Sequence, residues 1–520
     1  MSELSRSSGI GDPEPTVSGD RDQNDPESLP DAHKGSASEL RSKALSAVAL
    51  VAGRNVIIKI TALLGNIAFA RLLSPTDFGI VAFGLTILVF VQLLSDGGLG
   101  VGLIRRPEEP RPGDLRVLLG FQLLLTTVLG TAVAAVAVAG PFGRTGLVTA
   151  VMMPALPLLA FRAPSSIVFE HSLNYAPLVR VEIMEEVSFY GWGIATILLG
   201  AGVWGLATAA VIKSLVGTLV ILSISPVGRL LPSYSWERLK PMLGFGVKFQ
   251  AVNLVNSAGL QLLNVGITVV AGLTVLGLWA LAWRLAQLPY LLFGTLWRVS
   301  FPAAAKLMSS GESARRMIER GVGLAAVATG AILAPATGSI SPLIPAVFGH
   351  RWTPVADVLP VAFFALQASG PVSVATAGYL YAVGDTSTVL RATIVTSVVW
   401  LLVALPLLPW LGVTAVGVGW MVAALIEIPI LSTPVRRRTG AACLKPILTP
   451  WVAGSVAGAS GWLVSRTVSH GLIAAFLGAT VAMSVYAVPI MLLRREEIVT
   501  ILRLALRAVR PRDATRTRGA

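Results

Sequence analysis

Apolar segments of about twenty residues follow one another through most of the chain. A helix needs about 20 mostly apolar residues to cross the ~30 Å hydrocarbon core of a membrane, because each residue adds about 1.5 Å. Backbone groups cannot stay unpaired in lipid, so many such segments predict a bundle of transmembrane helices. With 54% hydrophobic and only 13% charged residues, the chain has little polar surface to offer water. We therefore predict an all-α polytopic membrane protein.

The length criterion predicts about fourteen transmembrane helices. Two segments fit it least well, because 181–200 contains three glutamates and 246–271 begins amphipathically, and without them the count is twelve. The predicted spans are 46–70, 78–95, 117–139, 146–167, 181–200, 203–224, 246–271, 275–297, 321–340, 355–380, 387–408, 412–432, 447–466 and 471–493.

Lys and Arg are concentrated in alternate connections between the predicted spans. The richer series includes 105–116, 229–248, 298–320 and 436–445, whereas the opposite series contains only Arg71, Arg144, Arg351 and Arg466. Because basic connections tend to stay on the cytoplasmic side, we expect both termini in the cytoplasm. The formal net charge of +14 then reflects membrane topology, and we expect no nucleic-acid partner.

An internal repeat is visible when the sequence is shifted by 198 residues. The shift places Asn66 on Asn264, Thr76 on Thr274, Gly79 on Gly277 and Ala82 on Ala280. A second, separate match links the turn at Gly200 and Gly202, before span 203–224, to the turn at Gly412. Both matches fall where a repeat of six spans predicts them, so two lobes related by an axis along the membrane normal are expected. Chance similarity among apolar helices is the alternative.

The repeat and the span count together predict five regions. Residues 1–43 are polar and form a disordered cytoplasmic tail. The remaining regions are an N-terminal six-helix lobe (44–226), a C-terminal six-helix lobe (227–433), two extra transmembrane helices (434–495) and a basic cytoplasmic tail (496–520).

Cations inside spans are the first candidates for a binding site, since a charge near the bilayer centre costs about 2.5–3.5 kcal/mol and usually faces a cavity or a partner. We single out Arg54, Lys59, Lys213 and Arg284. The last three lie ~14–18 Å from the outer ends of their spans. They predict a cavity that binds an anion, best a phosphate or diphosphate. Alternatively, Lys213 pairs with Glu186 and Arg54 reaches the cytoplasmic interface.

Acidic residues near the cytoplasmic end of span 181–200 are the second group of candidates. Glu185 and Glu186 either couple transport to a proton or sodium gradient or belong, with Glu182, to an interfacial turn. We interpret Trp279 and Trp283 as lipid-interface or helix-packing residues. The sequence presents neither a catalytic triad nor a P-loop, so we expect no enzyme and no cofactor.

The stretch from Leu63 to Arg106 resembles the beginning of bacterial polysaccharide repeat-unit flippases, which belong to the multidrug/oligosaccharidyl-lipid/polysaccharide exporter superfamily. It reads LLGNIAFARLLSPTDFGIVAFGLTILVFVQLLSDGGLGVGLIRR, with an Ala-Arg-Leu-Leu-Ser-Pro-x-Asp-Phe-Gly turn and a Gly-Leu-Gly end before paired arginines. Later segments similar to the family are 276–279, 298–302 and Phe348–Trp352. Asn264 and Trp279 depart from it, since the family often has an acid and a Tyr at these positions.

The resemblance implies two pseudo-symmetric six-helix lobes around a central cavity, plus two C-terminal helices, in the bacterial inner membrane. It implies that an undecaprenyl-diphosphate-linked oligosaccharide moves from the cytoplasmic to the outer leaflet by alternating access, with membrane lipid and polysaccharide assembly machinery as partners. A peptidoglycan-precursor flippase, a drug or cation antiporter, and a membrane glycan polymerase or ligase are the alternatives.

Overall fold

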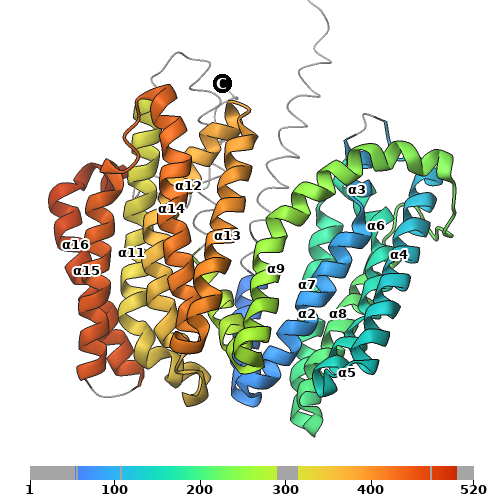
Figure 1. The fold of residues 1–520 in the computed structure, drawn as a ribbon, viewed down its shortest axis with the longest axis horizontal. Helices are drawn as coiled ribbons and strands as arrows, with labels where there is room; N and C mark the ends of the chain where they lie inside the picture. The colour runs from blue at the N-terminus through green and yellow to red at the C-terminus, as the bar shows by residue number, and fades with distance from the viewer. Residues whose placement is uncertain (1–52, 54–56, 106–107, 290–313, 469–470, 501–520) are drawn as a thin grey trace, which may run out of the picture.

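The computed structural model describes residues 53, 57–105, 108–289, 314–468 and 471–500 (Figure 1). Helices make up nearly all of this part of the chain, and no β-strand occurs in it. The first helix is described from 57 to 72. The others are α2 (Pro75–Asp96), α3 (Leu99–Ile104), α4 (Pro112–Ala139), α5 (Gly143–Met152), α6 (Ala155–His171), α7 (Ala176–Thr196), α8 (Val203–Ser223), α9 (Trp236–Ala286), α11 (Ala314–Phe348), α12 (Val355–Ala382), α13 (Thr386–Leu411), α14 (Thr414–Thr439), α15 (Lys445–Thr467) and α16 (Leu472–Leu493), with a π-helical turn at Ile197–Ala201 and a 3₁₀ turn at His350–Trp352.

Within the described ranges, eleven helices are long and apolar enough to cross a membrane, which confirms the all-α, multi-span prediction. Three predicted spans are not among them as separate helices. The charged α7 corresponds to 181–200, and the segment 46–70 lies partly outside the described residues. The third is the second arm of α9: Gly272, with φ 82° and ψ 177°, interrupts this helix between the predicted spans 246–271 and 275–297.

The helices form two groups, with an extra pair on one side (Figure 1). The first helix and α2 to α8 make the first group, and α11 to α14 make most of the second. The helices α15 and α16 pack on α11, away from the first group. The first arm of α9 begins over the first group and descends to the lower edge of Figure 1, where the two groups lie closest together.

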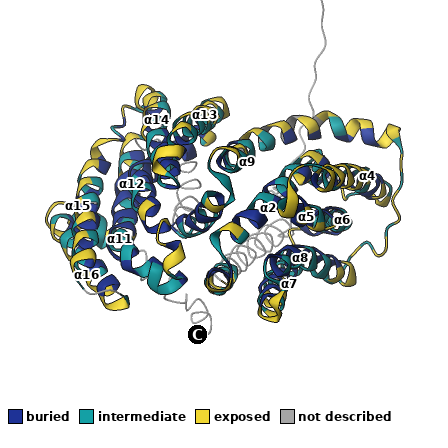
Figure 2. Ribbon diagram, turned by 60° about the horizontal axis from the view of Figure 1, so that its bottom comes forward, coloured by how far each residue is buried: buried dark blue, intermediate teal, exposed yellow. Residues whose placement is uncertain are grey.

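The side chains on the outward faces of the helices are largely apolar. Figure 2 shows exposed residues along these faces, and large hydrophobic ones include Leu402 and Trp410 on α13 and Phe476 on α16. Trp410 is 77% exposed and Phe476 is 72% exposed, values that favour contact with lipid rather than water. The chain is therefore a multi-pass membrane protein.

The two groups meet through residues that the repeat had paired. The hydroxyl of Thr76 lies 2.8 Å from that of Thr274, its partner at a shift of 198 residues. A Cβ on Gly79 would overlap the carbonyl oxygen of Leu273, and one on Gly277 would overlap that of Pro75, which is the same contact seen from the other repeat. When a residue of one repeat contacts a residue of the other and their equivalents make the same contact in reverse, the two repeats are related by a two-fold axis. The structure thus confirms the two pseudo-symmetric lobes.

The second sequence match is confirmed in the backbone. Gly202, before α8, has φ 55° and ψ −129°, and Gly412, before α14, has φ 54° and ψ −139°. Positive φ values of this kind favour glycine. The same turn therefore stands at equivalent places in both lobes.

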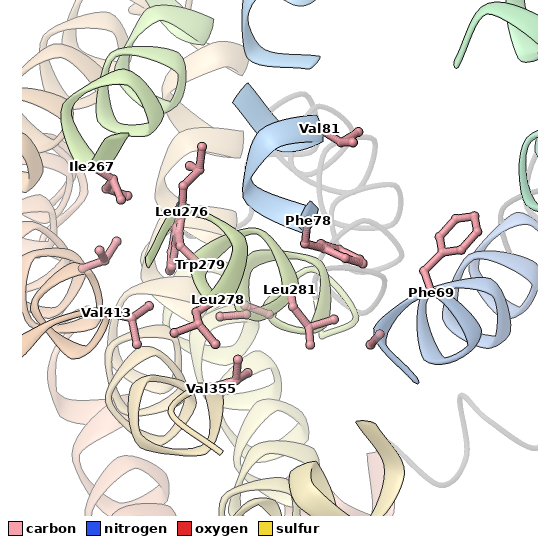
Figure 3. Close-up of a cluster of buried hydrophobic side chains, with 14 of the residues drawn as sticks. Phe69, Phe78, Val81, Ile267, Leu276, Leu278, Trp279, Leu281, Val355 and Val413 are labelled. Carbon is pink, nitrogen blue, oxygen red and sulfur yellow. The ribbon is translucent and has the colours of Figure 1, made fainter. Parts of the chain in front are cut away.

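Buried hydrophobic side chains fill the seam between the lobes at the lower edge of Figure 1. Figure 3 shows Phe78 of α2 near Leu276 and Leu281 of α9, with Val355 of α12 beyond them. The ring of Phe78 is 1% exposed, and the two leucines are fully buried. We call this region the outer seam, after the sequence-based prediction that these helix ends lie on the outer side of the membrane.

The turn that follows α11 closes the outer seam. The indole of Trp352 is fully buried, donates a 2.8 Å hydrogen bond to the carbonyl of Ala70, and packs edge-on against Phe78 at 5.1 Å between ring centres. In the opposite direction, Arg71 of the first lobe donates a 2.7 Å hydrogen bond to the carbonyl of Val347. Polar and apolar contacts therefore hold the lobes together at this end.

Candidate functional site

A cavity of about 620 Å³ lies between the first helix, α2, α6, α7, α8 and the second arm of α9. Its walls are mixed: leucines and aromatic rings alternate with polar and charged side chains. The charged residues that line it are Lys59, Arg162, Glu185, Glu186, Lys213 and Arg284. Charges inside a membrane-spanning bundle usually mark a substrate or ion path, so this is the candidate site.

Two ion pairs occupy one wall of the cavity. Glu185 of α7 receives a hydrogen bond from Arg162 of α6, and the two side chains are only 8% and 18% exposed. Glu186, the next residue, pairs with Lys213 of α8. Adjacent residues on a helix point about 100° apart, so the two carboxylates reach opposite neighbours. Gly217 makes room for Glu185, because a Cβ there would overlap the carboxylate.

Arg284 enters the cavity from the second arm of α9. It donates a hydrogen bond to the side-chain oxygen of Asn66 on the first helix, and its guanidinium lies 5.0 Å from the centre of the Phe78 ring. The amide of Asn66 in turn donates to the hydroxyl of Tyr190 at 3.3 Å and to the carbonyl of Ala62 at 2.6 Å. Arg284 is therefore held at the cavity by neutral partners.

Lys59 lies on the cavity wall without a partner among the described residues. The lining thus contains four cations and two carboxylates, and both carboxylates are already paired with cations. The surplus of two positive charges resides on Lys59 and Arg284. Such a cavity attracts an anion with about two negative charges.

The structure places five of the six predicted residues in this one cavity. Lys59, Lys213 and Arg284 line it together with Glu185 and Glu186, and Arg54 lies outside the described residues. Of the two interpretations of Lys213, the structure shows the pair with Glu186.

Sequence reasoning missed several members of the site. Arg162 falls inside the predicted span 146–167, so the rule that selected the other cations applies to it equally. Asn66 and Tyr190 carry no charge, so the search for cations inside spans does not find them, and Asn66 stands out only as a member of the repeat. Of the two interpretations of Trp283, the structure shows helix packing, with 5.4 Å between its ring centre and that of Trp420, and it also places Trp283 in the cavity lining.

Comparison with known proteins adds independent findings. The model of the family described as Polysaccharide biosynthesis protein matches residues 68–357. Over 334 residues, 62% of this chain, the sequence is 26% identical to the lipopolysaccharide biosynthesis protein WzxC of Escherichia coli (strain K12). It is 24% identical over 293 residues, 54% of this chain, to the succinoglycan biosynthesis transport protein ExoT of Rhizobium meliloti (strain 1021). These matches span 66% and 58% of the two relatives, just under two thirds of the first.

Solved structures share the fold. The lipid II flippase MurJ in an inward closed conformation superimposes with a TM-score of 0.70, covering 86% of this chain and 98% of that one at 12% identity. An inward-facing multidrug resistance transporter of the MATE family, from the MOP superfamily, gives 0.51, with 73% and 96% coverage at 19% identity. At these identities the likeness concerns the fold alone.

Proposed function

Because the chain belongs to the polysaccharide biosynthesis protein family, we propose that it is a flippase for lipid-linked oligosaccharides. Its substrate is an undecaprenyl-diphosphate-linked polysaccharide repeat unit, moved across the cell membrane by alternating access. One observation carries the proposal: the cavity between the lobes has a surplus of two cations, Lys59 and Arg284. A diphosphate ester supplies the matching negative charge.

The roles of the charged residues follow from their partners. Among the described residues Lys59 has no partner, and Arg284 contacts the neutral amide of Asn66 and the ring of Phe78. Both can therefore donate hydrogen bonds to phosphate oxygens without breaking an ion pair of the described part of the chain. A phosphate oxygen carries negative charge and can bind the guanidinium through two parallel hydrogen bonds, whereas the amide oxygen of Asn66 is neutral, so the phosphate displaces the amide from Arg284. Lys213 and Arg162 neutralise the neighbouring glutamates and keep the wall polar but uncharged overall.

The outer seam fits one state of an alternating-access cycle. Here the lobes are joined at their outer ends through Trp352, Phe78 and Thr76. We propose that this is the state that receives substrate from the cytoplasmic side, and that release to the outer leaflet requires the seam to separate. Both termini lie in the cytoplasm in this proposal, and the membrane is the bacterial inner membrane.

A gradient of protons or sodium ions is the proposed energy source, with Glu185 and Glu186 as the coupling groups. Both carboxylates are held by cations in this state, so an ion or proton binds to them only when the pairs open. Interaction with polysaccharide assembly machinery is proposed on the same basis as the substrate, from the names of the relatives.

The charge of the cavity and the names of the related proteins separate the proposed function from its alternatives. A cavity with surplus cations repels a cationic drug, which disfavours a drug or cation antiporter. A peptidoglycan-precursor flippase needs the same diphosphate chemistry, but the related proteins are named for lipopolysaccharide and succinoglycan biosynthesis. One of them is named as a transport protein, which favours a transporter over a glycan polymerase or ligase.

The test is a leaflet-exchange assay in proteoliposomes with a labelled undecaprenyl-diphosphate oligosaccharide. We expect exchange well above that of protein-free liposomes, and a loss of exchange when Lys59 and Arg284 are both replaced by Ala. Arg111→Ala is the matched control, since this exposed residue pairs with Glu108 and lies outside the cavity lining. Exchange equal to that of empty liposomes would refute the proposal.

A further inference from the structure

A second cavity, of about 260 Å³, lies inside the first lobe between α2, α4 and α6. It adjoins the cavity described above, because Gln92, Leu159 and Arg162 line both. We call it the polar recess. Its other polar side chains are Ser95, Asp96, Gln122, Thr126 and Ser166.

The polar recess offers donors and acceptors without surplus positive charge. Asp96 accepts a 2.9 Å hydrogen bond from the amide of Gln122. Thr126 donates to the carbonyl of Gln122 at 2.7 Å, which leaves its oxygen lone pairs available. Arg162, the one cation of the lining, is already paired with Glu185. This chemistry suits a ligand with many hydroxyl groups and no phosphate.

Two side chains of the polar recess have unused hydrogen-bonding capacity. Neither Gln92 nor Ser166 makes a side-chain hydrogen bond within the described part of the chain. Gln92 is exposed at the boundary of the two cavities, and Ser166 is half-buried in the recess. Polar groups are rare inside membrane-spanning helices unless they line a path or have a partner.

A purely structural role explains only part of this arrangement. Asp96 accepts a hydrogen bond from the backbone of Gly98 as well as from Gln122, so both side chains help to fix the turn between α2 and α3. That role requires neither the free amide of Gln92 nor the hydroxyl of Ser166. It also does not require an open volume joined to the charged cavity.

We propose that the polar recess is a glycan subsite, which takes the sugar joined directly to the diphosphate. The inference rests on the proposed function. A diphosphate held by Lys59 and Arg284 places its first sugar beside the cavity wall, where Gln92 and Arg162 mark the entrance to the recess. Hydroxyl groups of the sugar then pair with Gln92, Ser166 and Asp96.

The test compares two probes on the purified, reconstituted protein: undecaprenyl diphosphate alone, and the same lipid diphosphate carrying one hexose. We expect the wild type to bind the hexose-bearing probe more tightly. Ala163→Leu fills the recess, and Ser166→Ala removes one free hydroxyl without adding bulk. Ser166→Ala should weaken binding of the hexose probe by about 2- to 13-fold, the value of one lost hydrogen bond. Ala163→Leu should abolish the preference, and neither variant should change binding of the bare lipid diphosphate.

The matched control is Gln287→Leu, which alters the wall of the charged cavity but not the recess. It should leave the ratio of the two affinities unchanged. Thermal unfolding checks that each variant is folded. If Ala163→Leu does not fold, Ser166→Ala alone tests the recess. Equal affinity of the wild type for both probes, or an equal effect of the recess variants on both, would overturn the glycan subsite. If the wild type bound neither probe, the proposed function itself would fall.

Discussion

Trp352→Ala tests whether the outer seam keeps the lobes closed. Trp352 belongs to the 3₁₀ turn before α12, in the second lobe, and its ring is fully buried. Its contacts across the seam are the hydrogen bond to the carbonyl of Ala70 at 2.8 Å and the edge-on packing on Phe78 at 5.1 Å. These contacts are lost whenever the outer ends of the lobes separate.

The size of the effect follows from these two contacts. Truncation of a buried Trp costs about 3–5 kcal/mol in total, but part of that is packing within the second lobe, which both states keep. The hydrogen bond contributes about 0.5–1.5 kcal/mol, and the aromatic pair about the same. Trp352→Ala therefore removes about 1–3 kcal/mol of the free energy that favours the closed seam. This corresponds to a 5- to 150-fold shift of the equilibrium toward separated lobes.

Labelling of a buried cysteine measures this shift directly. Thr86 of α2 is 3% exposed and accepts a hydrogen bond from Asn264 of α9 across the lobe interface, so Thr86→Cys reacts with a thiol reagent only when the lobes separate. The native thiol of Cys443, which is also buried, is removed by Cys443→Ala. In this background Trp352→Ala should raise the labelling rate by 5- to 150-fold.

Trp451→Ala is the matched control. Its indole donates a 3.3 Å hydrogen bond to the carbonyl of Phe364 and packs on that ring at 5.0 Å, but both residues lie on the side of the second lobe away from the seam. It should lower the thermal stability of the protein and leave the labelling of residue 86 unchanged. If both tryptophan variants accelerated labelling equally, or neither did, the seam would not be the closing contact.

Three further outcomes are expected. Lys59→Ala and Arg284→Thr should each weaken binding of undecaprenyl diphosphate by about 13- to 150-fold, the value of one charge-assisted hydrogen bond, as measured by titration of the reconstituted protein. Glu185→Gln should destabilise the protein by about 3–5 kcal/mol in unfolding experiments, because it leaves Arg162 buried without its partner, whereas the double variant with Arg162→Met should recover most of that loss. Gly79→Val should prevent closure of the outer seam, seen as fast labelling at residue 86, since its side chain overlaps the backbone of the facing arm.

The fold was largely predictable because its dominant constraint is local. Each span must be apolar over about 20 residues whatever it packs against, and that requirement is visible in the sequence. The break in α9 was predicted as the boundary between 246–271 and 275–297, and Gly272 marks it in the structure. The charged α7 was one of the two weakest predictions, because it does not meet the local requirement by itself. Its glutamates are acceptable in a span only beside the cations of α6 and α8.

The candidate site was predictable only where a residue carries a charge. A lone cation in an apolar run is conspicuous, and Lys59, Lys213 and Arg284 were found in this way. Asn66 and Tyr190 are neutral, and their importance comes from the hydrogen bonds that connect them to Arg284 across the lobes. Trp283 packs between helices as one of its two interpretations predicted, but its place in the cavity lining could not be read from the sequence, because an aromatic residue in a span looks the same whether or not it borders a cavity.

The repeat explains why the anion-binding charge sits on only one side of the pseudo-two-fold axis. A shift of 198 residues relates Asn66 to Asn264 and also relates Thr86 to Arg284. In one half of the interface Asn264 donates a 3.1 Å hydrogen bond to the hydroxyl of Thr86, and in the other Arg284 donates to the side-chain oxygen of Asn66. The two bonds are the same inter-lobe contact, made once with a neutral hydroxyl and once with a guanidinium. Arg284 therefore adds a charge to a contact that is neutral in the other half of the interface. A phosphate bound to Arg284 would break its hydrogen bond to Asn66, one of the two equivalent inter-lobe hydrogen bonds. In the proposed function, binding of an anion at this position loosens the lobe interface on one side of the axis, which would connect occupancy of the cavity to separation of the outer seam.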